Sequence, residues 1–288
     1  MMAKNNFCTG LMYTHSSWSD YWEGTWERNN QNIGTVTTNM YAVMGNYGVT
    51  NSFDVIFGLP YVTTNASAGT LIGQKGFQDL SLWLKWKSLV KKVNRATYSA
   101  YLLGGGSVPV SNYVIDYQPL SIGLGSRTLS GRLILDYQQG HYFMTGSGTY
   151  TYRGNVTIDR TSYYTTQLIL SNQVEMPDVA SYELRTGYRS DWLIAEAILT
   201  GMKTLGGFDI RRNDMPFPSN EMNNMTLGVN AKYTTPWVSG LSITGGGNYV
   251  LAGRNVGQST TFNIGVFYII DFSKKVKATT SNPEIDQK

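Results

Sequence analysis

The sequence is poor in charge, in cysteine and in long apolar runs, and each shortage excludes a class of protein. Charged residues make up 15 % of the 288 positions, against roughly 25 % in ordinary soluble domains. The single cysteine, Cys8, excludes an internal disulfide, a cysteine-rich zinc site and a CxxC redox motif. No run of about 18 apolar residues occurs, which excludes a helical membrane span. The net charge of +4 is small and scattered, so we expect no nucleic-acid partner.

The first ten residues also lack an apolar stretch of signal-peptide length. If the protein is exported, we therefore expect this sequence to be a mature form with a replaced start. Aromatic residues make up 13 % of the chain, which together with the low charge argues against intrinsic disorder.

Apolar side chains recur at every second position along the whole chain, which is the period of a β-strand. One such face consists of Phe53, Val55, Phe57, Leu59 and Tyr61, and another of Phe262, Ile264, Val266, Tyr268, Ile270 and Phe272. The apolar faces tend to end in aromatic residues, as membrane-interface girdles do, at Tyr61, Trp86, Tyr137, Tyr233 and Phe272. An open sheet edge in hydrocarbon leaves backbone groups unsatisfied. The pattern therefore predicts an all-β fold, a closed transmembrane antiparallel β-barrel.

Short and long connections alternate along the chain, which is typical of periplasmic turns and extracellular loops. The expected twelve strands span 7–17, 33–46, 52–62, 78–90, 95–106, 127–137, 141–153, 180–189, 191–204, 224–235, 240–252 and 258–272. We interpret 118–127 as loop or as an extension of a strand, because a thirteenth strand would break the even count of bacterial barrels. We expect one barrel over 1–272 and a polar periplasmic tail over 273–288. Phe272 is the candidate signal to the barrel assembly machinery.

The strand period assigns one set of side chains to the barrel interior, and these are the candidate lining of a solute path. They are Asp54, Asp79, Trp83, Lys85, Lys87, Arg132, Phe143, Glu183, Arg185, Glu196, Lys232 and Phe267. With Asp136 added, acids and bases balance at five each, so no ring of one sign predicts ion selectivity. Two interpretations remain open: a paired network that props the wall, or charges and aromatic rings that guide a solute.

Catalytic residues are scarce, and we expect no enzyme, no metal and no cofactor. His15 and Ser17 share one strand face, and some outer-membrane lipid hydrolases use such a His-x-Ser pair as base and nucleophile. No third, orienting residue is evident from the sequence. His141 follows a predicted turn and is interpreted as a rim residue.

The segment 208–224 is the most unusual outer loop. Phe208, Arg211, Arg212 and Asp214 are candidates for a lid or a capture site. They are explained equally well as ordinary loop residues without a binding role.

Two neighbouring segments resemble a known family. YGVTNSFDVIFGLPYV (47–62) is followed by GFQDLSLWLKW (76–86), and together they are similar to the outer-membrane family named for the meta-pathway of phenol degradation. The matching features are a Tyr-Gly turn, a strand ending in Leu-Pro-Tyr, and a Gly-x-x-Asp strand that ends in Lys. The resemblance covers roughly 40–90 and implies an outer-membrane channel for hydrophobic or aromatic compounds.

The expected function is passive uptake of small hydrophobic or aromatic solutes across the bacterial outer membrane. The expected partners are outer-membrane lipid, such a solute and the barrel assembly machinery. A lipid hydrolase that uses His15 and Ser17, or a structural barrel without transport, are the alternatives.

Overall fold

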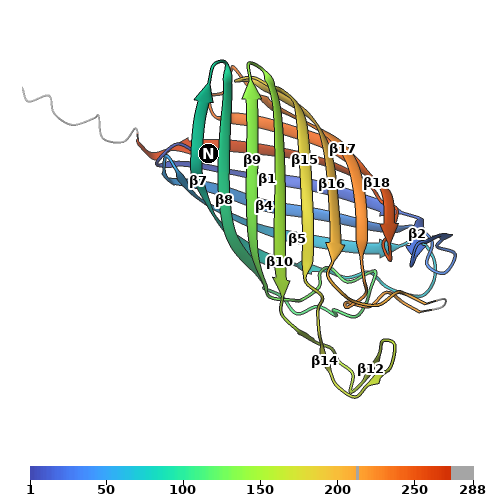
Figure 1. The fold of residues 1–288 in the computed structure, drawn as a ribbon. Helices are drawn as coiled ribbons and strands as arrows, with labels where there is room; N and C mark the ends of the chain where they lie inside the picture. The colour runs from blue at the N-terminus through green and yellow to red at the C-terminus, as the bar shows by residue number, and fades with distance from the viewer. Residues whose placement is uncertain (212–213, 274–288) are drawn as a thin grey trace, which may run out of the picture.

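The computed structural model describes residues 1–211 and 214–273 and contains one closed barrel. Within these residues, twelve long strands form the wall (Figure 1): β1 (Asn6–Trp18), β4 (Val36–Thr50), β5 (Phe53–Ala66), β7 (Asp79–Val93), β8 (Ala96–Pro109), β9 (Thr128–Gln139), β10 (Tyr142–Arg153), β15 (Val179–Arg189), β16 (Leu193–Thr204), β17 (Asn223–Thr234), β18 (Leu241–Arg254) and β19 (Thr260–Asp271). Each wall strand pairs antiparallel with its sequence neighbours, and β1 pairs with β19 to close the ring. The predicted fold class and strand count are confirmed.

Seven short strands lie outside this wall set: β2 (Asp20–Glu23), β3 (Trp26–Asn29), β6 (Lys75–Phe77), β11 (Val156–Thr157), β12 (Tyr163–Tyr164), β13 (Leu168–Ile169) and β14 (Gln173–Val174). All except β6, which pairs with the outer part of β5, form small hairpins in the loops. Segment 118–127 forms no strand, so its interpretation as loop is confirmed. The described residues contain no helix long and apolar enough to cross a membrane.

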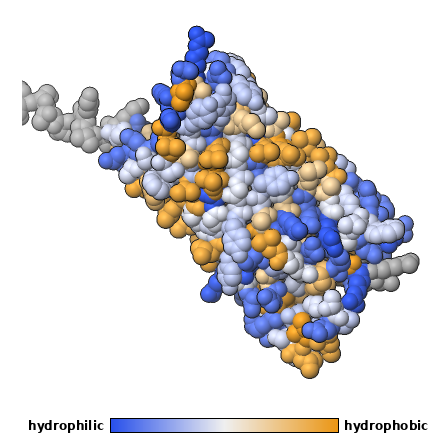
Figure 2. Space-filling model, viewed as in Figure 1, coloured by the Kyte–Doolittle hydropathy of each residue, from blue (hydrophilic) through white to orange (hydrophobic). Residues whose placement is uncertain are grey.

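The outer wall of the barrel is apolar. Alternate side chains of each strand point outward, and these are the apolar ones. Leu11, Leu129, Val229 and Phe262 are 61–67 % exposed, and a soluble monomer does not tolerate so many large exposed apolar groups. Figure 2 shows apolar side chains over the viewed wall, with strongly hydrophilic ones mainly toward its two ends. Aromatic pairs lie toward both ends of the wall, for example Tyr98 with Tyr137 at the short-turn end and Tyr61 with Phe77 toward the loop end. The outer wall therefore has the apolar surface and aromatic girdles of a barrel that contacts membrane lipid.

The five short turns gather at one end of the barrel and the six longer connections at the other (Figure 1). Asn94 and Gly140 provide the positive φ angles (53° and 60°) that two of the tight turns require. Asn5 bonds Gly48 and Phe272 through the backbone, so both described ends of the chain lie at the short-turn end, which is periplasmic in such barrels. Of the predicted tail, 274–288 lie outside the described residues.

Residues 110–127, which we call the mouth loop, contain no strand and fold back over the barrel mouth. Leu120 is wholly buried and packs with Ile33 and Val36. Its backbone oxygen accepts a hydrogen bond of 2.6 Å from Thr64 Oγ1 of β5. Thr64 and Val36 lie on the inner faces of their strands, so this loop fills the loop-side mouth of the barrel with apolar side chains.

Candidate functional site

The twelve residues predicted to line a solute path all lie on the inner face of the barrel. They alternate with the exposed apolar residues of the same strands, as Lys85 does between Leu84 and Trp86. Seven of them border an interior cavity with a volume of about 610 Å³: Lys85, Arg132, Glu183, Arg185, Glu196, Lys232 and Phe267. The other five, Asp54, Asp79, Trp83, Lys87 and Phe143, do not border this cavity. The inward placement of all twelve follows from the period, whereas a role in solute passage stays a prediction.

A second cavity of about 330 Å³ lies toward the loop side of the barrel. Arg185, Asn230 and Thr244 line both cavities, so the two spaces adjoin inside the barrel. Its other walls are small and mostly uncharged, with Thr14 and Asn263 among them. The interior therefore contains a charged space near the periplasmic end and a neutral polar space above it.

Two arginines on β15 pair with all three carboxylates that line the larger cavity. Arg185 lies 2.7 Å from Glu183 and 3.0 Å from Glu196. Arg189 lies 3.1 Å from Asp136, and its guanidinium covers the ring of Phe143 at 3.9 Å. These pairs join β15 to β9 and β16, and this part of the interior fits the interpretation of a paired network that props the wall.

Three other cations border the larger cavity without an ion pair among the described residues: Lys85, Arg132 and Lys232. Lys85 lies over the Tyr101 ring at 4.7 Å. Arg132 lies over the Trp83 ring at 5.2 Å and donates through Nε to Thr149 Oγ1 at 2.8 Å. The sequence predicts equal numbers of inward acidic and basic side chains, but the structure distributes them unevenly. The acids that line the cavity gather around β15, so these three cations face the cavity without an acidic partner.

The inward aromatic residues mostly support arginines. Trp83 lies against Gly105 of β8, where a Cβ atom would approach the indole to 2.5 Å, so the glycine lets the ring lie close to the wall below Arg132. Phe143 is wholly buried and is out of reach of a solute. Of the predicted aromatic set, Phe267 borders the cavity, and Tyr101 joins it.

Asp54 and Asp79 hold chain segments at the two ends of the barrel. Asp54 is wholly buried and accepts a hydrogen bond of 3.0 Å from the backbone N–H of Met2. Asp79 accepts one of 2.9 Å from Tyr113 of the mouth loop. Their partners give these two carboxylates an anchoring role.

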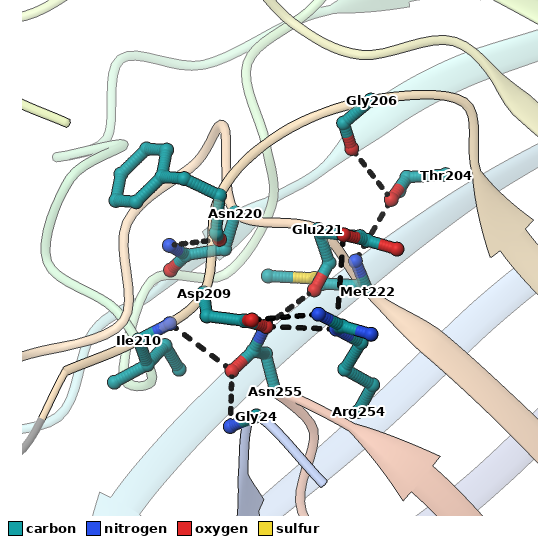
Figure 3. Close-up of polar contacts among 11 residues, drawn as sticks. Gly24, Thr204, Gly206, Asp209, Ile210, Asn220, Glu221, Met222, Arg254 and Asn255 are labelled. Atoms are coloured by element: carbon teal, nitrogen blue, oxygen red, sulfur yellow. Dashed lines mark hydrogen bonds and ion pairs between the residues drawn. The ribbon is translucent and has the colours of Figure 1, made fainter. Parts of the chain in front are cut away.

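Three outer loops meet at Asn255, which is buried and has a positive φ of 53°. Its side-chain oxygen accepts hydrogen bonds from Gly24 N at 2.8 Å and Ile210 N at 3.1 Å, as Figure 3 shows. Its amide nitrogen donates to Asp209 Oδ1 at 2.8 Å and to Glu221 O at 2.7 Å. We call these residues, with Arg254, the loop lock.

Asp209 also forms an ion pair with Arg254 at 2.6 Å. The hydrogen bond from Arg254 is the main cause that lowers the pKa of the Asp209 carboxyl below its ordinary value. The loop lock therefore depends on an ionised carboxylate.

The residues predicted as an outer capture site do not converge on one cavity. Phe208 contacts Phe217, whereas Arg211 lies over Tyr164 at 5.0 Å. Asp214 N donates to Arg211 O, and Arg212 lies outside the described residues. Arg211 and Asp214 are exposed, and the ligand-capture role proposed for the segment stays a prediction.

His15 and Ser17 lie on the outer, lipid-facing side of β1, since Leu11 on the same face is 65 % exposed. His15 Nδ1 lies 2.9 Å from Asn39 Oδ1 on β4, the orienting amide that the sequence alone did not reveal. No hydrogen bond joins His15 to Ser17 within the described residues. His141 is exposed beside a short turn, as expected.

Sequence reasoning missed Arg189 and the loop lock. Arg189 has the same parity as Glu183 and Arg185 on one strand, so the strand period was a sufficient signal for it. The contacts of Asn255 reach Gly24, which is 231 positions away in the sequence, so no local sequence pattern predicts them.

No protein-family model matches the chain, and no curated protein sequence matches it either. Among solved structures, an outer membrane channel from Pseudomonas putida F1 superposes with a TM-score of 0.74 and 14 % identity, over 94 % of this chain and 97 % of that one. This chain has the fold of that channel. With its lipid-facing wall, the fold places the protein in the bacterial outer membrane.

Two further likenesses are looser. The translocator domain of the autotransporter NalP from Neisseria meningitidis has a TM-score of 0.45 and 10 % identity, over 91 % of this chain and 88 % of that one. The TodX monoaromatic hydrocarbon channel has a TM-score of 0.44 and 10 % identity, over 94 % and 91 %. Neither likeness is close enough to carry an argument about this chain.

Proposed function

We propose that this protein is a passive outer-membrane channel for small hydrophobic or aromatic solutes. The observation that carries the proposal is the pair of adjoining cavities inside a closed twelve-stranded wall. Barrels of eight strands are just filled by their own side chains, and barrels of 16–18 leave an open aqueous channel. A twelve-stranded barrel falls between them, which suits a narrow path for one small molecule at a time.

Several features favour a solute path over a structural barrel. Ion pairs occupy one side of the larger cavity, while Lys85, Arg132 and Lys232 face its free space. The resemblance of 47–62 and 76–86 to the phenol meta-pathway family supports an aromatic or hydrophobic solute. Chain insertion by the barrel assembly machinery, with Phe272 as the signal and residues 273–288 as a periplasmic tail, belongs to the same proposal.

Single-channel recording of the refolded protein in a planar bilayer tests the channel. We expect discrete current steps of low conductance, which a simple phenol in the bath reduces. The matched control is a variant with Thr226→Trp and Asn248→Trp, which fills the neutral cavity from two neighbouring strands. Its folding is checked by its heat-dependent gel shift. Equal currents from both proteins would contradict a path through the lumen.

Lipid hydrolysis is a second candidate, favoured by the contact between His15 Nδ1 and Asn39 Oδ1. An amide in this position orients the ring of a general base. Ser17 Oγ would then attack an ester carbonyl while His15 Nε2 takes its proton and passes it to the leaving alcohol, and water would release the acyl group.

Ser17→Ala and Ser16→Ala form a matched pair for this second candidate, because Ser16 faces the interior and contacts Thr261 Oγ1. Release of fatty acid from phospholipid that is lost in Ser17→Ala and kept in Ser16→Ala would establish hydrolysis. No release by the wild type would exclude it.

A further inference from the structure

The larger interior cavity has a surplus of positive charge. Five basic and three acidic side chains line it: Lys85, Arg132, Arg185, Arg189 and Lys232 against Asp136, Glu183 and Glu196. All three acids lie within ion-pair distance of Arg185 or Arg189. The surplus therefore resides on the other three cations, which project from β7, β9 and β17 on different sides of the space.

Arg132 is the best placed of these three to receive an anion. Its Nε is bound to Thr149, and its two terminal nitrogens form no hydrogen bond with described residues. The Trp83 ring below it fixes the plane of the guanidinium. A fixed guanidinium with two free terminal donors matches the geometry of a carboxylate, which accepts two parallel hydrogen bonds.

Lys232 and Lys85 extend the positive field over the cavity. Lys232 borders it without a hydrogen bond or an ion pair to described residues. Lys85 lies opposite Asp54 in the strand register, which offsets part of its charge. Asp54 is itself wholly buried, bonds Met2 and does not border the cavity. The three carboxylates that do border it lie within ion-pair distance of Arg185 or Arg189 and not of Arg132.

The remaining lining is apolar and aromatic. Tyr101, Ile134, Ile194 and Phe267 border the same space, and an aromatic ligand is stabilised by stacking on such rings. Inorganic phosphate would leave these apolar surfaces in contact with water, whereas the flat ring of an aromatic acid would cover them. The volume of about 610 Å³ lies within the usual range for small-molecule sites.

We propose that this cavity is a binding site for small aromatic carboxylates, held by Arg132 and Lys232 with the ring against Tyr101 and Phe267. The inference rests on the proposed channel function and names the class of solute that this channel selects: anionic aromatic acids in preference to their neutral analogues.

Block of the channel current by benzoate and by benzamide, which share size and shape, tests the proposal. We expect benzoate to halve the wild-type current at a concentration at least about tenfold lower than benzamide, since one charge-assisted hydrogen bond accounts for that factor. Arg132→Gln and Lys232→Gln should each raise the benzoate concentration for half block by about tenfold and leave the effect of benzamide unchanged.

Lys87→Gln is the matched control, because Lys87 also points inward from β7 but does not border the cavity. It should leave the benzoate block within about twofold of the wild type, the change expected of a remote screened charge. Equal block by the two compounds, or an equal loss of block in Lys87→Gln and Lys232→Gln, would overturn the proposal.

Equilibrium dialysis of radiolabelled benzoate against the protein in detergent micelles separates this proposal from the channel itself. Saturable binding that Arg132→Gln weakens, in a protein that carries no current, would uphold the site and refute the channel. Current without any preference for benzoate would uphold the channel and refute the site.

Discussion

The two ends of the barrel interior are built differently. Near the periplasmic end, charged side chains stand directly on the wall strands and pair with one another, as Arg185 does with Glu183 and Glu196. At the other end, a loop fills the mouth with apolar side chains such as Leu120. Strand register fixes the first arrangement, while a few hydrogen bonds from loop to wall hold the second. We therefore expect the charged end to be rigid and the loop at the mouth to be able to move.

Removal of the mouth loop should have the largest effect on current. A variant in which 111–124 are replaced by a short glycine linker loses the buried Leu120, so we expect a several-fold rise in single-channel conductance with the wall strands intact. Shortening the turn at 165–167 between β12 and β13, which protrudes beyond the barrel in Figure 1, serves as the control. Similar conductance in the two variants would contradict a filled mouth.

Loss of Arg185 should have the largest effect on the stability of the charged end. Arg185→Met leaves Glu183 and Glu196 without their guanidinium, and we expect a loss of about 2 kcal/mol, at the lower side for a broken pair because the Arg185 side chain is 37 % exposed. Urea unfolding in detergent measures it. The triple variant with Glu183→Gln and Glu196→Gln should recover most of the loss, and a triple variant as unstable as the single one would argue against the pairing.

The loop lock should open without any effect on the barrel wall. Asn255→Ala removes four hydrogen bonds and places a Cβ-bearing residue of poor left-handed propensity at a φ of 53°. We expect faster protease cleavage within 205–222 and an unchanged urea midpoint for the wall. Asn255→Gly keeps the backbone angle and loses the same bonds, so a protease-resistant glycine variant would assign the lock to backbone geometry alone.

The smallest effect concerns pH. The pKa of Asp209 is lowered in the folded protein, chiefly by the hydrogen bond from Arg254, so its contribution is fully present above the ordinary aspartate value of 3.8 and is lost as pH falls through the lowered value. We expect current noise from loop movement to stay constant from neutral pH to about 4 and to rise below it. Asp209→Asn should show the noisier state at neutral pH. A wild-type transition near pH 6 would point to another group.

The sequence predicted the wall well because period two is a local signal. The expected strands differ from the observed ones by up to four residues at an end, as at β5, which continues past the expected end at Val62 to Ala66. The same parity placed Lys85, Arg132 and Lys232 inside the barrel, and it would have placed Arg189 there too.

Pairing partners were beyond the sequence because they depend on register between strands. His15 meets Asn39 only through the alignment of β1 with β4, and Arg189 reaches Asp136 from β15 to β9 across β10. The loop contacts of Leu120 and Asn255 join segments far apart in the chain. The contact between Asn255 and Gly24 depends on closure of the ring between β1 and β19, and the others depend on strand register or on how a loop folds back.

Cys8 provides the most direct test of a solute path, because it is the single cysteine and borders the larger cavity. In a bilayer we would measure how fast it reacts with two membrane-impermeant methanethiosulfonate reagents, one anionic and one cationic, while recording current, with Cys8→Ser as the blank. A solute path through a positive interior predicts faster reaction with the anionic reagent and a stepwise fall in current. A Cys8 that reacts with neither reagent in the folded protein, yet reacts after unfolding, would contradict the path.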